Sequence, residues 1–129
     1  MSENLAGIIL WTDNLLRLRS FYEETLGLHP HSVREDFIAY SWDLGTTDIR
    51  FSIGLHSEVS GRTKDPLRVM INFNVRNIED MVSKMKKAGT KFIRNPELEH
   101  WGGIVATFED PDGNVVQLLQ QPETELEDS

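Results

Sequence analysis

An internal repeat constrains the fold of this chain more than any other feature of its sequence. Residues 7–27 read "GIILWTDNLLRLRSFYEETLG" and residues 69–89 read "VMINFNVRNIEDMVSKMKKAG". Each stretch has an apolar run typical of a strand, then a polar residue that can cap a helix, then apolar residues at helical spacing. Each ends in a glycine, which suits the left-handed position after a helix. The repeat therefore predicts two copies of one structural module.

The rest of each half predicts three more strands. The expected helix caps are Asp13 and Asn77, whose side chains can accept hydrogen bonds from free amides of the first turn. Apolar and β-branched runs place the strands at 28–35, 37–44 and 48–56, and then at 91–94, 103–109 and 114–120. The turns "DLGTTD" and "DPDGN" precede the last strand of each half. The predicted order is βαβββ, repeated, which indicates an α+β fold.

The length of the chain fits one compact domain. With 129 residues, we expect a single domain over 1–121, with modules at about 5–56 and 67–121. Residues 57–66, "SEVSGRTKDP", are polar and contain glycine and proline, so we interpret them as a linker. Residues 122–129, "PETELEDS", are expected to form an acidic flexible tail.

Composition excludes several classes of partner. The net charge of -8 opposes binding to a phosphate backbone, so we expect no nucleic acid partner. No apolar run reaches the roughly 20 residues that span a bilayer, and the N-terminus lacks the features of a secretory signal, so no membrane partner is expected. The chain has no cysteine, which excludes disulfides and thiolate chemistry and fits a cytoplasmic location.

Two stretches give the chain a family resemblance. Residues 12–28, "TDNLLRLRSFYEETLGL", and residues 101–120, "WGGIVATFEDPDGNVVQLLQ", resemble the vicinal oxygen chelate superfamily, and the resemblance extends over residues 5–121. This superfamily groups glyoxalase I, bleomycin-resistance proteins, fosfomycin-resistance enzymes and extradiol dioxygenases. The resemblance implies two βαβββ modules forming a cupped mixed sheet, with helices on the convex side and a small-molecule ligand in the concave cavity. It also implies a homodimer.

The metal-ligand positions of that superfamily are altered in this chain. The resemblance implies a His or Gln early on the first strand of each module and a Glu on the last strand of each. Matched by motif, these positions hold Ala6 and Met70, and Arg50 and Gln117. Only Gln117 could be a ligand, and a lone amide oxygen is a poor one. We therefore expect no metal and no other cofactor.

Strand alternation assigns several polar residues to one face. Arg50 shares its face with Ser52 and His56, opposite an apolar set, and Asn72 likewise shares its face with Met70. Arg50 is a candidate for binding a carboxylate, a phosphate or a polarised oxygen. Otherwise it pairs with an acid such as Glu35, Asp43 or Asp48, or is simply solvated. Gln117 and Asn72 are candidates for hydrogen bonds to a ligand, or else they satisfy each other or backbone groups. Met70 is expected to be a pocket wall.

The aromatic residues and histidines leave further alternatives open. Tyr40 and Trp42 share a strand face and could stack a flat ligand, or else belong to the core or an interface. Trp11 is expected in the core or at a dimer surface. His100 and Trp101 precede two glycines and are candidates for a rim over the cavity. A carboxylate beside His56 or His100 would favour a metal site built from other residues.

Two functions follow from these residues. The first is metal-free binding of a small organic molecule in the concave cavity. The expected ligand-binding residues are Arg50, Gln117, Asn72, Met70, Trp42, Tyr40, His100 and Trp101. The alternative is a glyoxalase-like lyase or isomerase with Arg50 as electrophile and His56 as base, or a metal-dependent member with a rearranged site. The sequence leaves open whether the protein is an enzyme.

Overall fold

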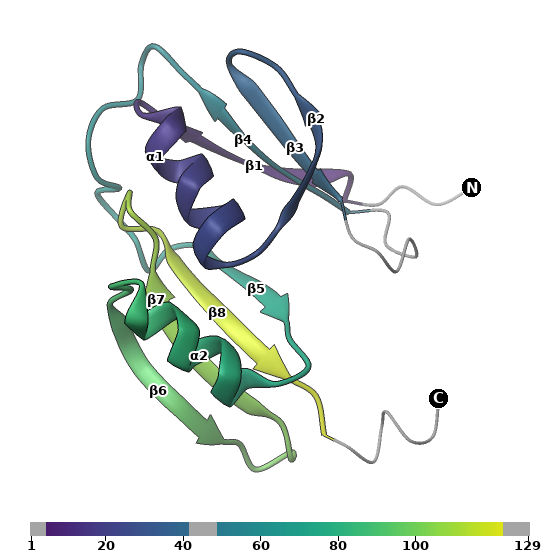
Figure 1. Cartoon of the computed structure of the whole chain (residues 1–129). Coiled ribbons are helices and arrows are strands. Elements are labelled where there is room, and N and C mark those ends of the chain that lie inside the picture. Colours follow the sequence, from purple (N-terminus) through teal and green to yellow (C-terminus); the bar gives the residue numbers. More distant parts are fainter. Residues whose placement is uncertain (1–4, 42–48, 123–129) are drawn as a thin grey trace. The chain divides into compact units, whose positions relative to one another are not determined.

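Two units make up the chain. The structure, a computed structural model, describes residues 5–41 and 49–122 (Figure 1). Its contacts divide the chain into Met1–Gly61 and Arg62–Ser129, and this boundary falls within the predicted linker. Each unit holds one four-stranded mixed sheet and one helical segment. The predicted α+β fold of two βαβββ modules is confirmed.

The first unit orders its strands β1-β4-β3-β2. Its elements are β1 (Gly7–Thr12), α1 (Leu15–Ser20), the π-helical turn η1 (Phe21–Thr25), β2 (His29–Val33), β3 (Phe37–Ser41) and β4 (Arg50–Leu55). Strand β1 runs parallel to β4, whereas β3 is antiparallel to both β4 and β2. The parallel pair requires a crossover, which the helix and the two intervening strands provide.

The second unit repeats this topology with the order β5-β8-β7-β6. Its elements are β5 (Met70–Asn74), α2 (Ile78–Lys87), β6 (Phe92–Leu98), β7 (Ile104–Glu109) and β8 (Val115–Gln120). Strand β6 is longer than the predicted 91–94, and its pairing with β7 shifts register between Arg94 and Glu97. The irregularity accommodates Pro96, because β6 is an edge strand and proline has no amide to donate.

The helix caps differ from the prediction in one module. Asn77 caps α2 as expected, accepting from the amide of Asp80 at 3.1 Å. In the first module the cap is Asn14, which accepts from the amide of Arg17 at 3.1 Å, and not Asp13. Asp13 instead accepts from the amide of Gly61 at 2.8 Å. Adjacent Asp and Asn both suit a cap, so sequence alone did not decide between them.

The first helical segment widens into a π-helical turn that the sequence did not predict. In η1, Phe21 and Tyr22 are both buried, and their rings meet edge to face at 5.2 Å. The ring centroid of Tyr22 also lies 5.2 Å from that of Phe51 in β4. The segment stops before Gly27, whose φ of 87° is the left-handed conformation expected there.

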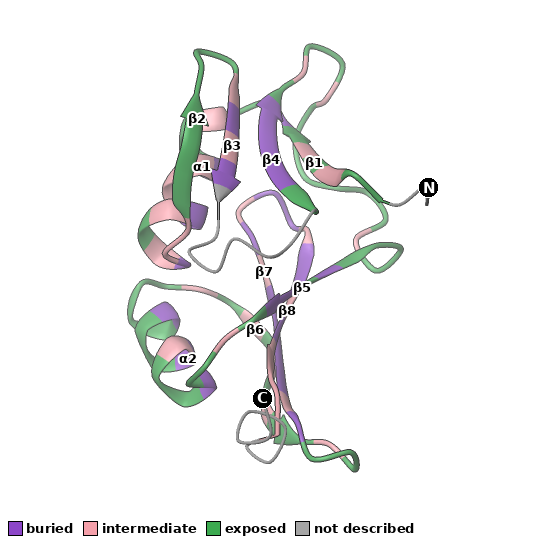
Figure 2. Ribbon diagram, turned by 90° about the vertical axis from the view of Figure 1, so that its right-hand side faces the viewer, coloured by how far each residue is buried: buried purple, intermediate pink, exposed green. Residues whose placement is uncertain are grey.

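Each sheet has one face packed against its helix and one face that is free of it. In the first sheet Phe51 and Ile53 lie on the helix side, and in the second sheet Ile71, Phe73 and Leu118 do so. These residues are 9% exposed or less. Figure 2 shows the contrast between the buried β4 and the exposed edge strand β2. We call the opposite side of each sheet its helix-free face.

The "DPDGN" turn fixes the entry of β8. The carboxylate of Asp110 accepts from the amides of Asp112 and Asn114, both at 2.9 Å, and from the side-chain amide of Asn114 at 2.8 Å. Gly113 completes the turn with a φ of 84°. The turn therefore sets which residues of β8 face away from α2.

Candidate functional site

A row of polar side chains crosses the helix-free face of the second sheet. Asn72 of β5 pairs with Gln117 of β8, and Gln117 pairs with Thr107 of β7. Paired residues project to the same side of a sheet, with Cβ atoms about 5 Å apart. We call Asn72, Gln117 and Thr107 the polar row. Gln117 is the polar residue within the apolar run of β8, and it points away from α2.

The side chains of the polar row make no hydrogen bonds within residues 5–41 and 49–122. Asn72 is exposed, Gln117 is half-buried and Thr107 is buried. The predicted alternative, in which Asn72 and Gln117 satisfy each other, is not formed in the structure. Gln120, on the helix side of the same strand, behaves differently, because its side-chain oxygen accepts from the amide of Ile78 at 2.8 Å. Gln120 therefore belongs to the scaffold, whereas the side chains of the polar row have no such hydrogen bond in the described part of the chain.

Arg94 closes one end of the polar row. It pairs with Thr107 in the β6–β7 ladder. Its guanidinium donates to Glu97 at 2.7 Å and to Glu99 at 2.8 Å, and these hydrogen bonds raise the pKa of Arg94 above its usual value. Two carboxylates already bind the guanidinium of Arg94 and fix its position. It therefore adds little unpaired positive charge to this face.

The pairing register revises the positions equivalent to metal ligands. Met70 lies seven residues before the cap Asn77, and the residue seven before the cap Asn14 is Gly7, not Ala6. The ladders agree, since Gly7 pairs with Arg50 as Met70 pairs with Val115. Gln117 lies two residues beyond Val115, so its counterpart in the first module is Ser52, two residues beyond Arg50.

The revised set fits a metal no better than the predicted one. Its members are Gly7, Ser52, Met70 and Gln117. They offer one hydroxyl, one thioether and one amide, and no carboxylate or imidazole. No group of three His, Cys, Asp or Glu side chains comes together anywhere in the described residues. These residues therefore do not fit the metal that the resemblance implies.

Arg50 is exposed at the start of β4, on the helix-free face of the first sheet. It does not pair with Glu35, while the other two predicted partners, Asp43 and Asp48, lie outside the described residues. His56 directly follows the other end of β4, so the two side chains are separated by about 20 Å of extended strand. They are too far apart to act on one reacting atom, as the lyase or isomerase alternative requires.

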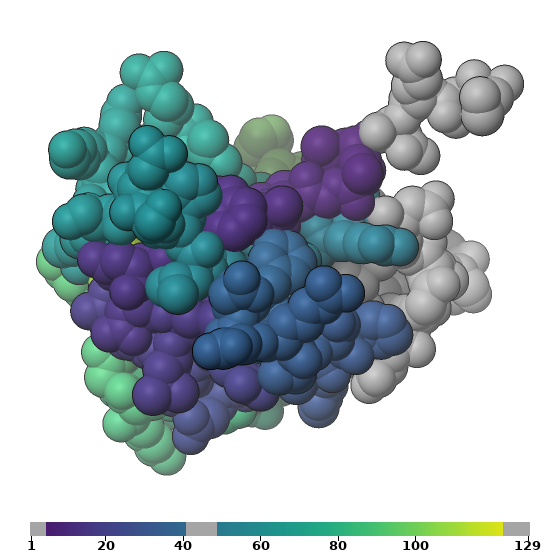
Figure 3. All heavy atoms as spheres, turned by 90° about the horizontal axis from the view of Figure 1, so that it is seen from above, coloured from purple at the N-terminus to yellow at the C-terminus, as the bar shows by residue number. Residues whose placement is uncertain are grey.

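A shallow pocket of about 330 Å³ lies at the end of the first sheet where His56 stands. It is lined by Trp11, Asp36, Phe37, Leu55, His56 and Ser57. The segments that carry these residues adjoin on one face, coloured purple, blue and teal in Figure 3. The sequence placed Trp11 in the core or at a dimer surface and missed the pocket. The available signal was Gly54, a glycine inside a strand.

A metal site built from other residues would need a carboxylate beside His56. Asp36 lines the same pocket, but the Nδ1 atom of His56 accepts from the amide of Glu58 at 3.1 Å. Only Nε2 would remain for a ligand bond, and no third His, Cys, Asp or Glu groups with this pair in the described chain. The pocket therefore has too few donors for a metal ion.

Tyr40 lies on the helix side of the first sheet and not on its helix-free face. It is 4% exposed, its ring stacks on Phe51 at 5.9 Å, and its hydroxyl donates to Glu23 at 3.0 Å. Burial and the neighbouring Glu23 carboxylate raise the pKa of Tyr40 above its usual value. Tyr40 is therefore a core residue, which was one of the alternatives that the sequence left open for it. Trp42, its predicted partner, lies outside the described residues.

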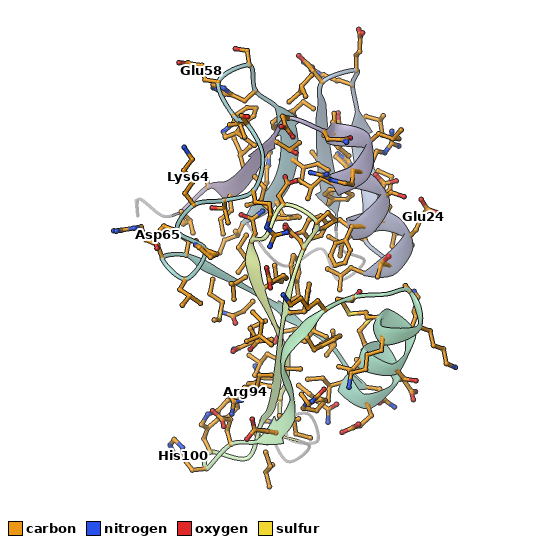
Figure 4. The ribbon with its side chains drawn as sticks, turned by 90° about the vertical axis from the view of Figure 1, so that its left-hand side faces the viewer. Glu24, Glu58, Lys64, Asp65, Arg94 and His100 are labelled. Atoms are coloured by element: carbon orange, nitrogen blue, oxygen red, sulfur yellow. The ribbon has the colours of Figure 1, made fainter. Side chains whose placement is uncertain are left out.

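His100 and Trp101 lie in the turn between β6 and β7. Figure 4 shows His100 at the far end of this connection, beyond Arg94. The ring of Trp101 folds over Gly103, where a Cβ would meet it at 2.0 Å. Trp101 is thereby held against its own hairpin and remains 45% exposed. The structure describes no contact between this turn and the polar row.

Comparison with known proteins decides the family. A model of the Glyoxalase/Bleomycin resistance protein/Dioxygenase superfamily matches residues 4–118. The chain belongs to this superfamily. The chain is also similar to the uncharacterized protein YraH of Bacillus subtilis (strain 168), with 28% identity over 125 residues that cover 90% of this chain and 97% of that protein.

Several solved structures share the fold of this chain. A protein of unknown function from Agrobacterium tumefaciens str. C58 matches with a TM-score of 0.74 and 19% identity, covering 94% of this chain and 96% of that one. A glyoxalase-related enzyme from Fulvimarina pelagi matches with a TM-score of 0.72 and 21% identity, covering 93% and 89%. At these identities the likeness concerns the fold alone. Within the described residues, no helix has the length and apolar character that crossing a membrane requires.

Proposed function

We propose that this protein binds a small organic molecule on the helix-free face of its second sheet, without a metal ion. The observation that carries the proposal is the polar row of Asn72, Gln117 and Thr107, whose hydrogen-bonding groups have no partner within the described residues. Along the same face the strands present apolar neighbours, including Met70, Val105, Val115 and Leu119. A few polar groups among apolar ones are what orient a ligand in a binding site.

The chemistry of the row favours a neutral ligand with a carbonyl or amide group. An amide side chain offers both donors and an acceptor, and a threonine hydroxyl offers one of each. None of the three carries a charge, and the adjacent guanidinium of Arg94 is already held by Glu97 and Glu99. A ligand that hydrogen-bonds both Asn72 and Gln117 would supply partners that these two side chains lack within the described residues.

The metal-free part of the proposal rests on donor chemistry. Where metal-dependent relatives are expected to carry imidazole and carboxylate ligands, this chain carries Gly7, Ser52, Met70 and Gln117. Arg50 stands two residues from Ser52 and would place a positive charge near that position, which disfavours a divalent cation. We keep Arg50 as a proposed contact for an oxygen-rich ligand on the first sheet.

We also propose that the protein is a cytoplasmic homodimer. Edge strand β2 is exposed along its whole length, and apolar residues such as Ile9 and Val33 are 46% and 52% exposed. Unpaired edges and exposed apolar side chains favour association with a second copy. Light scattering during size exclusion should give twice the 14.8 kDa mass of one chain, and a single-chain mass would contradict the proposal.

The binding proposal is tested by NMR on ¹⁵N-labelled protein. The side-chain amide signals of Asn72, Gln117 and Gln120 are assigned with the variants Asn72→Ala, Gln117→Leu and Gln120→Leu. A library of neutral amides, imides and ketones is then titrated. We expect at least one compound to give saturable shifts at Asn72 and Gln117 while Gln120 stays unchanged. If no compound moves the first two signals, or all three move together, the row is not a binding surface.

A further inference from the structure

The pocket of the first unit owes its existence to one glycine. Gly54 of β4 pairs with Trp11 of β1 and with Phe37 of β3. A Cβ at Gly54 would meet the Trp11 ring at 2.5 Å and the Phe37 ring at 2.8 Å. Because Gly54 has no side chain, both rings lie across its backbone, with their centroids 5.9 Å apart.

The aromatic wall of this pocket is fixed in place but still open. The His56 ring meets the Trp11 ring edge to face with centroids 5.3 Å apart, and the Phe37 ring lies 5.9 Å from the Trp11 ring at a tilt of 48°. Trp11 nevertheless keeps 42% of its surface exposed. A large aromatic side chain that contacts two other rings and is still partly exposed offers a preformed surface for a ligand.

The polar groups of the pocket favour positive charge in a ligand. Asp36 contributes the carboxylate, and no lysine or arginine is among the six lining residues. The amide of Glu58 donates to Nδ1 of His56, which places the proton of a neutral imidazole on Nε2. The wall therefore combines two π faces, one carboxylate and an imidazole whose Nδ1 already accepts a hydrogen bond, and the net charge of -8 adds to the attraction.

We propose that this pocket, here called the Trp11 pocket, binds a small organic cation, an ammonium group carried on a single ring or a short apolar chain. Its volume of about 330 Å³ is at the small end of known ligand sites and accommodates a group of that size. The ammonium would lie against the Trp11 and Phe37 rings and pair with Asp36. This site lies on the first unit, whereas the polar row belongs to the second.

The test uses three probes that share a benzyl group and differ in charge. Benzyltrimethylammonium, benzyl alcohol and phenylacetate are titrated separately into the ¹⁵N-labelled full chain. The readout is the indole N–H signal of Trp11, assigned by Trp11→Phe and separate from the signals of the polar row. We expect saturable shifts with the ammonium probe and a dissociation constant about tenfold larger for the alcohol. Equal or tighter binding of phenylacetate would overturn the proposal.

Two matched variants isolate the carboxylate. Asp36→Asn should weaken the ammonium probe about tenfold and leave the alcohol unchanged, because it removes charge and little volume. Asp65→Asn is the control, since this exposed acid pairs with Arg68 and does not line the pocket. If both variants weaken the ammonium probe equally, the attraction comes from net charge alone and the proposed site is wrong. If Asp36→Asn has no effect, the proposal also fails.

Discussion

The two sheets of this protein share a topology and a register but differ in the chemistry of their helix-free faces. In the first sheet Ile9, Ser52 and Ala39 are cross-strand neighbours, and their counterparts in the second are Asn72, Gln117 and Thr107. Two residues further along, Trp11, Gly54 and Phe37 correspond to Asn74, Leu119 and Val105. One backbone plan thus supports an aromatic pocket in one unit and a polar row in the other.

The difference teaches that single positions on the central strand decide what each face can bind. Gly54 opens the first face where Leu119 fills the second, and Gln117 brings hydrogen-bonding groups where Ser52 brings a smaller one. Neither change disturbs the helix side, where both sheets bury apolar residues. A module of this kind can therefore change its ligand chemistry while its scaffold stays constant.

Filling the space above Gly54 should have the largest effect. Gly54→Ala places a Cβ within 2.5 Å of the Trp11 ring, so we expect a loss of about 2 kcal/mol in the free energy of unfolding. Chemical denaturation measures it. Trp11→Ala in the same background removes one of the two clashes and should recover part of the loss. No recovery would mean that the ring does not lie over Gly54.

The two glutamines of β8, Gln117 and Gln120, should differ in how much they stabilise the fold. Gln120→Leu removes the hydrogen bond to the amide of Ile78 and should lower the free energy of unfolding by about 1 kcal/mol. Gln117→Leu, on the other face of the same strand, should change it by less than about 0.5 kcal/mol. Denaturant titration of both variants provides the comparison. Equal losses would show that Gln117 also has a structural partner.

Replacing Tyr40 of the first sheet by the phenylalanine found at the matching position of the second sheet should alter stability at high pH. Tyr40 corresponds to Phe108, since they pair with Phe51 and Val116 respectively. Tyr40→Phe should cost about 1 kcal/mol at neutral pH, because the hydrogen bond to Glu23 is lost.

The pH dependence of that variant follows from the raised pKa of Tyr40. The unfolded chain releases the phenol proton near pH 10, whereas the folded chain holds it to higher pH. The contribution of Tyr40 is therefore complete below about pH 10 and declines as the pH rises further. Unfolding measured between pH 8 and 11 should give a flatter profile for Tyr40→Phe than for the parent. Identical slopes would contradict the buried, raised-pKa phenol.

The fold was predictable because its causes are local. Strand runs, caps and terminal glycines occur twice in the sequence, and Gly27 and Gly89 do adopt positive φ values of 87° and 93°. The polar row was half predicted, since alternation along a strand assigns Asn72 to a face but does not show which residue of β7 lies beside it. Thr107 entered the row only through strand pairing.

The missed parts depend on register and on close approach. Asn14 and not Asp13 caps the first helix, and that one-residue difference moves the metal-equivalent positions from Ala6 to Gly7. A single-residue shift exchanges the two faces of a strand, which is why small errors in a cap matter here. The Trp11 pocket depends on three strands meeting at Gly54, and no stretch of sequence contains that contact.

The most direct test of the account is a metal analysis of the untagged protein, followed by calorimetric titration with nickel, zinc and iron(II). The account predicts no stoichiometric metal in the purified protein and no tight binding of any of the three ions. This expectation follows from the hydroxyl, thioether and amide groups at Ser52, Met70 and Gln117. One tightly held ion per chain would contradict it and would overturn the metal-free part of the proposed function.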